Sequence, residues 1–275
     1  MGSIDQFFLG ASALPAMPEI ARQLIASFDD EMVDLHTVVT LTAKDQSLSL
    51  KILRLANSAR FARSRSVSTL AEAASVLGME RLRNLVLAAS IAGAFPRVEG
   101  FDRIAFWKHA IATGGYAQWF ARILGVDPDS GYLAGFMLRS GQLLMARALP
   151  DAIAQVEASC ATPGVRMAHE SRILGCSHVQ VTAELARRWQ LPQRLIDGFA
   201  HAARPLEAQP FSLLAALLNM ATVMADAGAL KVPASEALQT ADGPLLDHLR
   251  LDVPWLQSTA PGFEELTAPL DELLA

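Results

Sequence analysis

The chain of 275 residues is 52% hydrophobic and only 19% charged, a composition that excludes an intrinsically disordered protein. Its 23 basic and 28 acidic residues give a formal net charge of −5, so the overall positive charge of a typical nucleic-acid-binding protein is missing and no nucleic-acid partner is expected. Two cysteines are too few for a disulfide-stabilised scaffold, and the length allows one large domain or two small ones.

The first residues give no sign of export. Residues 1–13 have neither the basic start nor the apolar segment of a signal peptide, and we interpret them as a tail. The longest uncharged apolar stretch, residues 211–225, is shorter than the roughly 20 residues that a membrane span needs, so it predicts a buried helix. Cys160 and Cys176 lack metal-binding spacing and are interpreted as reduced thiols. These features predict a cytoplasmic protein without a membrane partner.

Signals for helix starts and ends follow one another through the first half of the chain. Thr69 and Glu72 have the spacing of a capping box, and Gly125 stands where a helix-ending glycine is common. Asp102 precedes a long apolar segment and is a candidate helix cap. The predicted helices are 19–28, 34–42, one that begins at 45 or 47, 69–78, 79–95 and 102–124.

The second half repeats this pattern. We expect one continuous helix from 129 or 130 to about 149, and further helices that start at 150, 170, 179, 192 and 210. The sequence has neither long alternation of apolar and polar residues nor an Asn-Gly or Asp-Gly turn between two such alternating stretches. The sequence therefore predicts an all-α fold. Breaks at 96–100 and 202–210 indicate helical lobes that pack on one another.

The six histidines are the first candidates for a metal site, since helical bundles hold metals on His and carboxylate side chains. None of them forms an HExxH motif, and each one alone is better explained as a surface or hydrogen-bonded core histidine. The sequence also lacks GxGxxG, P-loop and GxSxG motifs. Gly114 and Gly115 lie within a helical pattern and indicate close helix packing.

One segment gathers arginines. Arg54, Arg60, Arg63 and Arg65 surround Phe61, and the forked guanidinium groups suit the phosphate oxygens of a nucleotide or a phosphorylated partner. The alternative is an ordinary solvated loop after a helix. We expect Phe61 to anchor this loop in the core.

Short motifs occur in a fixed order between residues 14 and 201, and together they resemble the HDOD family, the HD-related output domain of bacterial signalling proteins. The helix-end residue Asn57 and the core candidate Phe61 belong to one of them. The matching segments are Leu14-Pro15-Ala16-Met17-Pro18 (LPxLP), Asn57-Ser58-Ala59-Arg60-Phe61 (NSAxF), Leu77-Gly78, Phe106-Trp107-Lys108-His109 (FWxH), and Glu170, Leu174-Gly175, His178 and Trp189-Gln190-Leu191-Pro192.

The resemblance implies a compact multi-helix fold in which an N-terminal helical lobe packs on an HD-like helical bundle. It places the HDOD domain at 14–205, with lobes at 14–96 and 101–205. Residues 206–275 are then expected to form a C-terminal helical extension packed on the core.

The sequence departs from the family at the site that names the HD superfamily. HDOD members often have the sequence GLLHDIG in a central helix, and the His-Asp dyad in this motif ligates metal in related phosphohydrolases. In this chain, Leu138 and Arg139 stand at the positions of the dyad. Leu138 offers no lone pair, and Arg139 places a permanent positive charge where a cation would lie. His109, His178 and His201 still match positions that bind metal in relatives. A single zinc ion on three histidines is not excluded by their number, but the nearby guanidinium argues against it, and we expect no metal and no cofactor.

Arg139 permits two interpretations. It can bind an anionic ligand in the former catalytic cleft, or it can pair with a local acid such as Asp226 or reach solvent. The resemblance implies a non-catalytic signal-transduction module that contacts other signalling proteins. The alternatives are an HD-superfamily phosphohydrolase or phosphodiesterase with an altered site, and a sensor of a nucleotide messenger. The lost dyad favours a non-enzyme.

Overall fold

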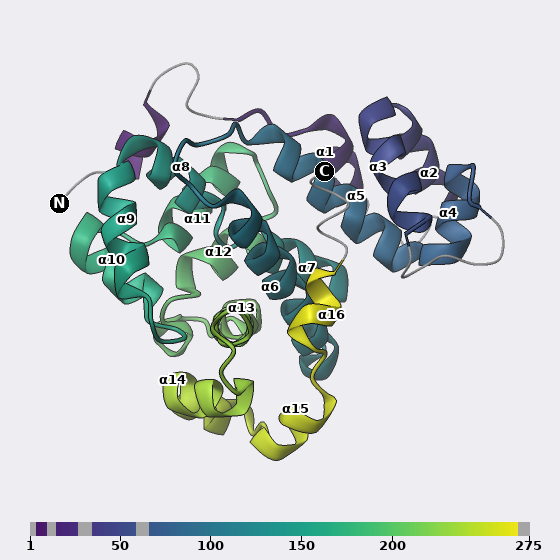
Figure 1. Cartoon of the computed structure of the whole chain (residues 1–275). Helices are drawn as coiled ribbons and strands as arrows, with labels where there is room; N and C mark the ends of the chain where they lie inside the picture. Colours follow the sequence, from purple (N-terminus) through teal and green to yellow (C-terminus); the bar gives the residue numbers. More distant parts are fainter. Residues whose placement is uncertain (1–3, 10–14, 27–34, 59–65, 269–275) are drawn as a thin grey trace. The chain divides into compact units, whose positions relative to one another are not determined.

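The computed structural model describes residues 4–9, 15–26, 35–58 and 66–268. In these ranges the regular structure is entirely helical, as the sequence predicts (Figure 1). The chain divides into two compact units, of which unit 1 comprises residues 1–14 and 97–267 and unit 2 comprises 15–96 with 268–275. The division near residue 96 coincides with a proline, Pro96, that ends an apolar helix.

Unit 2 is a small cluster of helices built around apolar faces. Ile52 and Leu55 of the third helix and Leu82 of the fifth are almost fully buried. Thr69 and Glu72 form the predicted capping box at the start of the fourth helix. The helices are α1 (Glu19–Ala26), α2 (Leu35–Ala43), α3 (Gln46–Ala56), α4 (Leu70–Leu77) and α5 (Met79–Ala94).

Asn57 closes the end of α3 through its side-chain amide. Nδ2 donates to the carbonyl oxygens of Leu53 at 2.9 Å and Val67 at 2.7 Å, while Oδ1 accepts from the backbone nitrogen of Val67 at 2.8 Å and from Ser66 Oγ at 3.1 Å. One side chain thus satisfies a helix-end carbonyl and holds the chain on both sides of residues 59–65.

Unit 1 contains the larger bundle, with two 3₁₀ helices, η1 (Ile4–Phe8) and η2 (Pro205–Glu207). Its α-helices are α6 (Arg103–Leu124), α7 (Pro128–Met137), α8 (Ser140–Ala148), α9 (Pro150–Ser159), α10 (Arg166–Leu174), α11 (His178–Arg188), α12 (Gln193–His201), α13 (Leu213–Leu230), α14 (Ala234–Leu249), α15 (Val253–Thr259) and α16 (Phe263–Thr267). The helices after residue 206 belong to the same unit.

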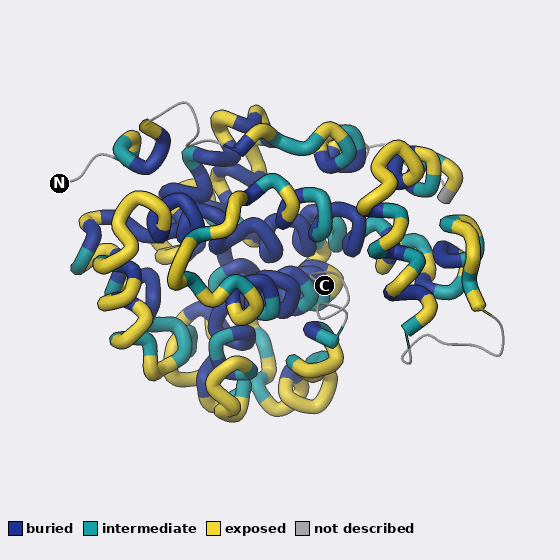
Figure 2. Tube along the Cα trace, turned by 45° about the horizontal axis from the view of Figure 1, so that its top comes forward, coloured by how far each residue is buried: buried dark blue, intermediate teal, exposed yellow. Residues whose placement is uncertain are grey.

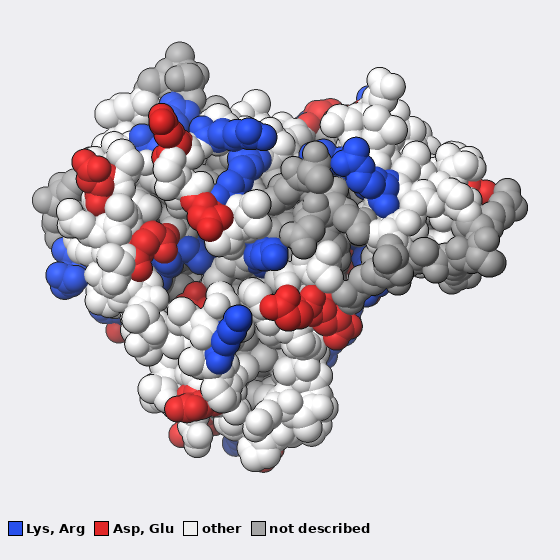
Figure 3. Space-filling view, in the orientation of Figure 1, with Lys and Arg blue, Asp and Glu red and all other residues white. Residues whose placement is uncertain are grey.

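The centre of unit 1 is formed by α6, α7 and α13, whose residues are mostly buried (Figure 2). Asp102 caps α6 as predicted, because its carboxylate accepts from the backbone nitrogen of Ala105 at 2.9 Å. A β-carbon at Gly135 would lie 2.6 Å from the carbonyl oxygen of Thr113, so glycine is needed where α7 crosses α6. By length and hydropathy α13 resembles a membrane-spanning helix, but its burial within unit 1 identifies it as a core helix. At the surface of unit 1, acidic and basic side chains are interspersed (Figure 3).

The predicted continuous helix from 129 or 130 to about 149 is wrong. The structure has two helices, α7 and α8, with a break at Leu138 and Arg139. The hydroxyl group of Thr182 on α11 donates to the carbonyl oxygen of Leu138 at 2.9 Å and accepts from the backbone nitrogen of Gly141 at 2.8 Å. A side chain from a distant helix therefore takes the place of helical hydrogen bonds at the break.

Candidate functional site

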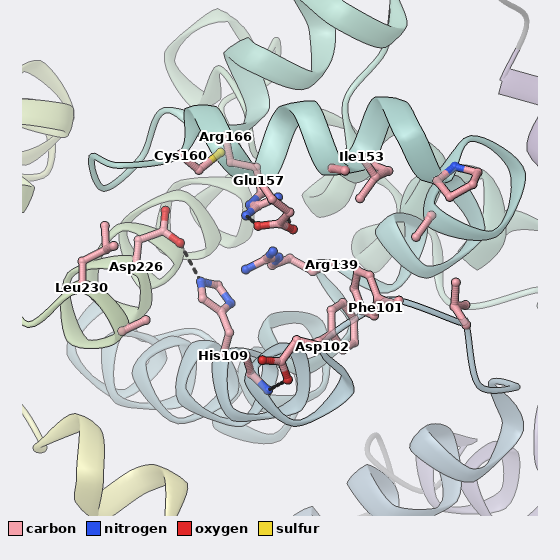
Figure 4. A pocket seen from close by; sticks show the side chains of 18 of the residues that line it. Phe101, Asp102, His109, Arg139, Ile153, Glu157, Cys160, Arg166, Asp226 and Leu230 are labelled. Carbon is pink, nitrogen blue, oxygen red and sulfur yellow. Dashed lines mark hydrogen bonds and ion pairs between the residues drawn. The ribbon is translucent and has the colours of Figure 1, made fainter.

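A cavity of about 540 Å³ opens within unit 1 among α6, α8, α9, α10 and α13 (Figure 4). This volume lies in the range of small-molecule sites. The side chains that matter here are polar groups at one end and apolar groups along the walls. The polar and thiol side chains include those of His109, Arg139, Glu157, Cys160, Arg166 and Asp226, with Glu99, Asp102 and Thr162 also in the lining, and the apolar ones include Phe101, Phe106, Ile153 and Leu230.

His109 is held in the cavity wall by a carboxylate from α13. Its Nε2 donates to Oδ1 of Asp226 at 2.7 Å, and the Thr113 hydroxyl lies 3.2 Å from Nδ1. Oδ2 of Asp226 accepts from the backbone nitrogen of Gly164 at 3.0 Å. Burial opposes ionisation of Asp226, but the hydrogen bond from His109 and the charge of Arg139 lower its pKa to about 2. Asp226 is therefore ionised at neutral pH.

The imidazole of His109 is neutral at neutral pH. Burial, with the positive charge of Arg139 as a second cause, lowers its pKa from 6.5 to about 4, although Asp226 acts in the opposite direction. The neutral ring with its Nε2 proton directed at Asp226 is the tautomer that this hydrogen bond requires.

Arg139 enters the cavity from the break between α7 and α8. Only 7% of the residue is exposed, its Nε donates to Oε1 of Gln142 at 2.8 Å, and the Cζ atom lies 5.9 Å from the ring centre of Phe106. Burial and the nearby charge of Arg166 lower its pKa to about 10, so it stays protonated at neutral pH. Within the part of the chain that the structure describes, Arg139 forms no hydrogen bond with Asp226, so the pairing considered from the sequence is absent.

A second arginine faces the same cavity but is already paired. Nη1 and Nη2 of Arg166 donate to the two carboxylate oxygens of Glu157 at 3.0 and 2.6 Å, a two-pronged ion pair. Gln142 Nε2 also donates to Glu157 Oε1 at 2.7 Å and so connects this pair with Arg139. Burial opposes the charge on Glu157, but the hydrogen bond from Arg166 keeps its pKa below the usual value.

His178 and Glu170 form a separate pair in the core. Oε2 of Glu170 accepts from Nδ1 of His178 at 2.6 Å and from its backbone nitrogen at 2.7 Å, and both residues are at most 1% exposed. Burial opposes ionisation of Glu170, yet the contacts with His178 lower its pKa. This pair joins α10 to the start of α11 and does not line the cavity.

The remaining positions of the HD remnant are apart from this site. Leu138 is fully buried at the end of α7, and His201 is exposed at the end of α12, where its Nδ1 donates to the carbonyl oxygen of Asp197 at 2.9 Å. The structure thus brings His109 and Arg139 to one cavity but places His178 and His201 elsewhere.

The residues at this site do not fit a catalytic metal. Within the described ranges, three His, Cys, Asp or Glu side chains do not converge in a way that could hold an ion. Nε2 of His109 already forms a hydrogen bond with Asp226 and is therefore not available to bind a metal. The buried guanidinium group of Arg139 also lies in this cavity. A divalent cation beside Arg139 would meet repulsion in a poorly solvated site.

The other signature residues have structural roles. Trp107 is buried and stacks on Phe136 with ring centres 5.3 Å apart, Gly175 ends α10 at φ 78°, and Trp189 and Pro192 flank the turn between α11 and α12. The Arg60, Arg63 and Arg65 loop and the anchor Phe61 lie outside the described residues, whereas Ser58 adjoins the end of α3.

Several residues of the site were not singled out from the sequence: Glu157, Arg166 and Gln142 carry no motif. Asp226 was named only as a possible partner of Arg139, although it is the only charged residue in the apolar helix α13, which marks it as a core carboxylate. A carboxylate in such a helix must meet a hydrogen-bond donor in the core.

The lowered pKa of His109 predicts how the free energy of unfolding depends on pH. Because the folded protein holds this pKa near 4 instead of 6.5, the unfolded chain binds a proton more readily between these two pH values. We expect the free energy of unfolding to fall by about 3 kcal/mol from this group as the pH falls from about 6.5 to about 4. Urea unfolding at several pH values measures this change.

Two variants separate His109 from the other titrating groups. His109→Gln keeps a donor for Asp226 but cannot titrate, so its stability should depend less on pH in this interval. The matched control His201→Gln changes an exposed histidine and should keep the wild-type pH dependence. Equal pH slopes for wild type and His109→Gln would contradict the assignment.

Comparison with known proteins agrees with this fold. The family model of the HDOD domain matches residues 14–205. The crystal structure of a "Putative phosphohydrolase from Shewanella amazonensis SB2B" is 28% identical, covers 98% of both chains and has a TM-score of 0.75. An HDOD domain protein from Geobacter sulfurreducens is 22% identical with a TM-score of 0.72, over 98% of this chain and 96% of that chain.

A curated relative is longer than this chain. An uncharacterized protein from Treponema pallidum is 26% identical over 217 residues, which are 75% of this chain but only 42% of the relative. The family model spans more than half of the present chain. The chain belongs to the HDOD domain family.

Proposed function

We propose that the chain is a cytoplasmic, non-catalytic signal-transduction module that acts through contacts with other signalling proteins. The observation that carries this proposal is the buried guanidinium group of Arg139 in the cavity of the former HD site. A site built for metal-assisted hydrolysis needs ligands with lone pairs and an open coordination position. Leu138 and Arg139 supply neither.

The surface through which such a module contacts its partners is proposed from the sequence. The arginines Arg60, Arg63 and Arg65 offer forked donors on an otherwise acidic protein. The partners themselves are signalling proteins of unknown identity.

A second function has one observation in its favour. The solved structure from Shewanella amazonensis bears the name "Putative phosphohydrolase", and its sequence is 28% identical to this chain over 98% of both chains. A phosphohydrolase with an altered site would still need a group that activates water. The neutral imidazole of His109 is hydrogen-bonded through Nε2 to Asp226, which resembles an oriented base.

Turnover assays with the purified full chain distinguish the two functions. We expect no hydrolysis of p-nitrophenyl phosphate or bis-p-nitrophenyl phosphate above the rate without protein, with or without Mg²⁺, Mn²⁺, Fe²⁺ or Zn²⁺. Elemental analysis should find no stoichiometric metal.

Contaminating phosphatases are controlled by a variant of the site. Metal-dependent turnover that is lost in His109→Ala, while the exposed control His201→Ala keeps it, would overturn the non-catalytic proposal and favour the phosphohydrolase. Equal weak turnover in all three proteins identifies a contaminant and supports the proposal.

A further inference from the structure

The Arg139 side chain ends in two terminal nitrogens that can donate hydrogen bonds. Its Nε atom is bonded to Gln142, but in the described part of the chain neither terminal nitrogen has a hydrogen-bond partner. The residue is more than nine-tenths buried, and Figure 4 shows its guanidinium group directed into the space between His109 and the Glu157–Arg166 pair. The two terminal nitrogens are accessible from the cavity and not sealed in the core, so an anion that enters the cavity can meet them.

The carboxylates of the cavity are already engaged. Both oxygens of Glu157 accept hydrogen bonds from Arg166, and one also accepts from Gln142. Both oxygens of Asp226 accept hydrogen bonds, one from His109 and the other from the backbone of Gly164. Arg139 is thus a charged donor that this cavity leaves for a ligand, and its two terminal nitrogens match a pair of oxygens on one group.

The balance of charge limits the charge of that ligand. Glu157 is paired with Arg166, whereas Asp226 is bonded to His109 and Gly164 and forms no ion pair with Arg139. At the mouth, Glu99 and Asp102 are exposed and add negative charge. One negative charge can be matched by Arg139, but a second would meet carboxylates without a free cation.

The rest of the cavity suits an apolar or flat molecular body. Phe106 and Ile153 are buried and line the wall, and Phe101 and Leu230 extend it towards the mouth. Small-molecule sites are usually lined by apolar side chains, and a few polar groups in them bind the polar part of the ligand.

We propose that this cavity binds a small organic molecule whose head is a singly charged oxyanion, either a carboxylate or a phosphodiester, with its two oxygens on the terminal nitrogens of Arg139 and its body against Phe106 and Ile153. This proposal rests on the proposed non-catalytic function, because it requires a metal-free site that holds its ligand unchanged. Ligand occupancy then gives the module an input.

The test compares probes that differ in charge. Thermal unfolding and isothermal titration of the full chain use adenosine 3′,5′-cyclic monophosphate as the phosphodiester and 4-phenylbutanoate as the carboxylate. Adenosine 5′-monophosphate carries the same base with a doubly charged phosphate, and adenosine carries no charge. At least one singly charged probe should raise the Tm and bind about tenfold or more tightly than the adenosine 5′-monophosphate and adenosine controls.

Variants locate the binding. Arg139→Gln should weaken the active probe about tenfold or more, since it removes the charged fork. Ala154→Trp places a large ring on the cavity wall from an exposed position, so it should block binding without disturbing the core, even if Arg139→Gln fails to fold. Arg172→Gln, an exposed arginine on α10 outside the cavity, should bind like wild type.

The results have direct consequences. The proposal is overturned if neither singly charged probe binds, if adenosine 5′-monophosphate or adenosine binds as tightly, or if binding survives in Ala154→Trp. Chromatography of the recovered probe separates this proposal from the function it rests on: an intact probe supports both, whereas hydrolysis of the bound phosphodiester would overturn the non-catalytic function. Failure to bind leaves that function standing.

Discussion

Replacing Glu170 by alanine should destabilise unit 1 by about 3–5 kcal/mol, the range for removing one partner of a buried pair. The carboxylate is fully buried and accepts from both Nδ1 and the backbone nitrogen of His178. Without it, two buried donors at the start of α11 lose their acceptor, and each unsatisfied group costs about 1–3 kcal/mol. Urea unfolding followed by circular dichroism at pH 7 measures the loss.

Two variants on the same helix sharpen this expectation. Glu170→Gln keeps an amide oxygen that can accept from His178, so its loss of stability should be smaller than that of Glu170→Ala. Arg172→Ala removes an exposed side chain and should stay within about 0.5 kcal/mol of wild type. If Glu170→Ala unfolds at the same urea concentration as Arg172→Ala, the buried pair does not stabilise the fold.

The substitution Gly141→Ala should cost about 3 kcal/mol or more, at the upper end for forcing extra atoms into a packed core. A β-carbon at Gly141 would overlap the carbonyl oxygen of His178 and lie 2.8 Å from the backbone nitrogen of Thr182. Both obstacles are backbone atoms of α11, which cannot rotate away as a side chain would. The strain would also separate Gly141 from Thr182, whose hydroxyl group forms hydrogen bonds with the backbone of Leu138 and Gly141 on either side of Arg139.

Gly243 provides the matched control for this prediction. It lies in α14 of the same unit, and a β-carbon added there meets no atom within 4 Å. Gly243 follows the kink at Asp242 and precedes Pro244, so the helix propensity of alanine adds little there, and Gly243→Ala should leave stability within about 0.5 kcal/mol of wild type. Equal urea midpoints for Gly141→Ala and Gly243→Ala would show that α11 yields to the added methyl group.

Much of the fold could be predicted because its signals are local. The capping box at Thr69 and Glu72 and the cap at Asp102 each involve residues three apart, so their hydrogen bonds depend little on the rest of the chain. Gly125 ends α6 at φ 69°, a left-handed conformation that glycine adopts readily. The all-α class followed from such signals, and the HDOD motifs named the family.

The candidate site could be predicted only in part. Leu138 and Arg139, at the positions where the HDOD resemblance implies a His-Asp dyad, are visible in the sequence, as is His109 in its FWxH motif. The hydrogen-bond partner of Arg139 was not predicted: Asp226 was offered as one example of a local acid, but it is bonded to His109, and Nε of Arg139 donates to Gln142. Which acid meets which base depends on how α6, α8 and α13 cross, and a single sequence does not contain those distances.

By itself, the sequence determined the helical class and the family, since both depend on residue types and short spacings. Only the tertiary structure decided the break between α7 and α8, because the hydroxyl group of Thr182 that holds it comes from α11, more than forty positions away. The same long-range contact sets the backbone from which Arg139 enters the cavity. The positive charge of Arg139 could be read from the sequence, but its position in the cavity depends on how the helices pack.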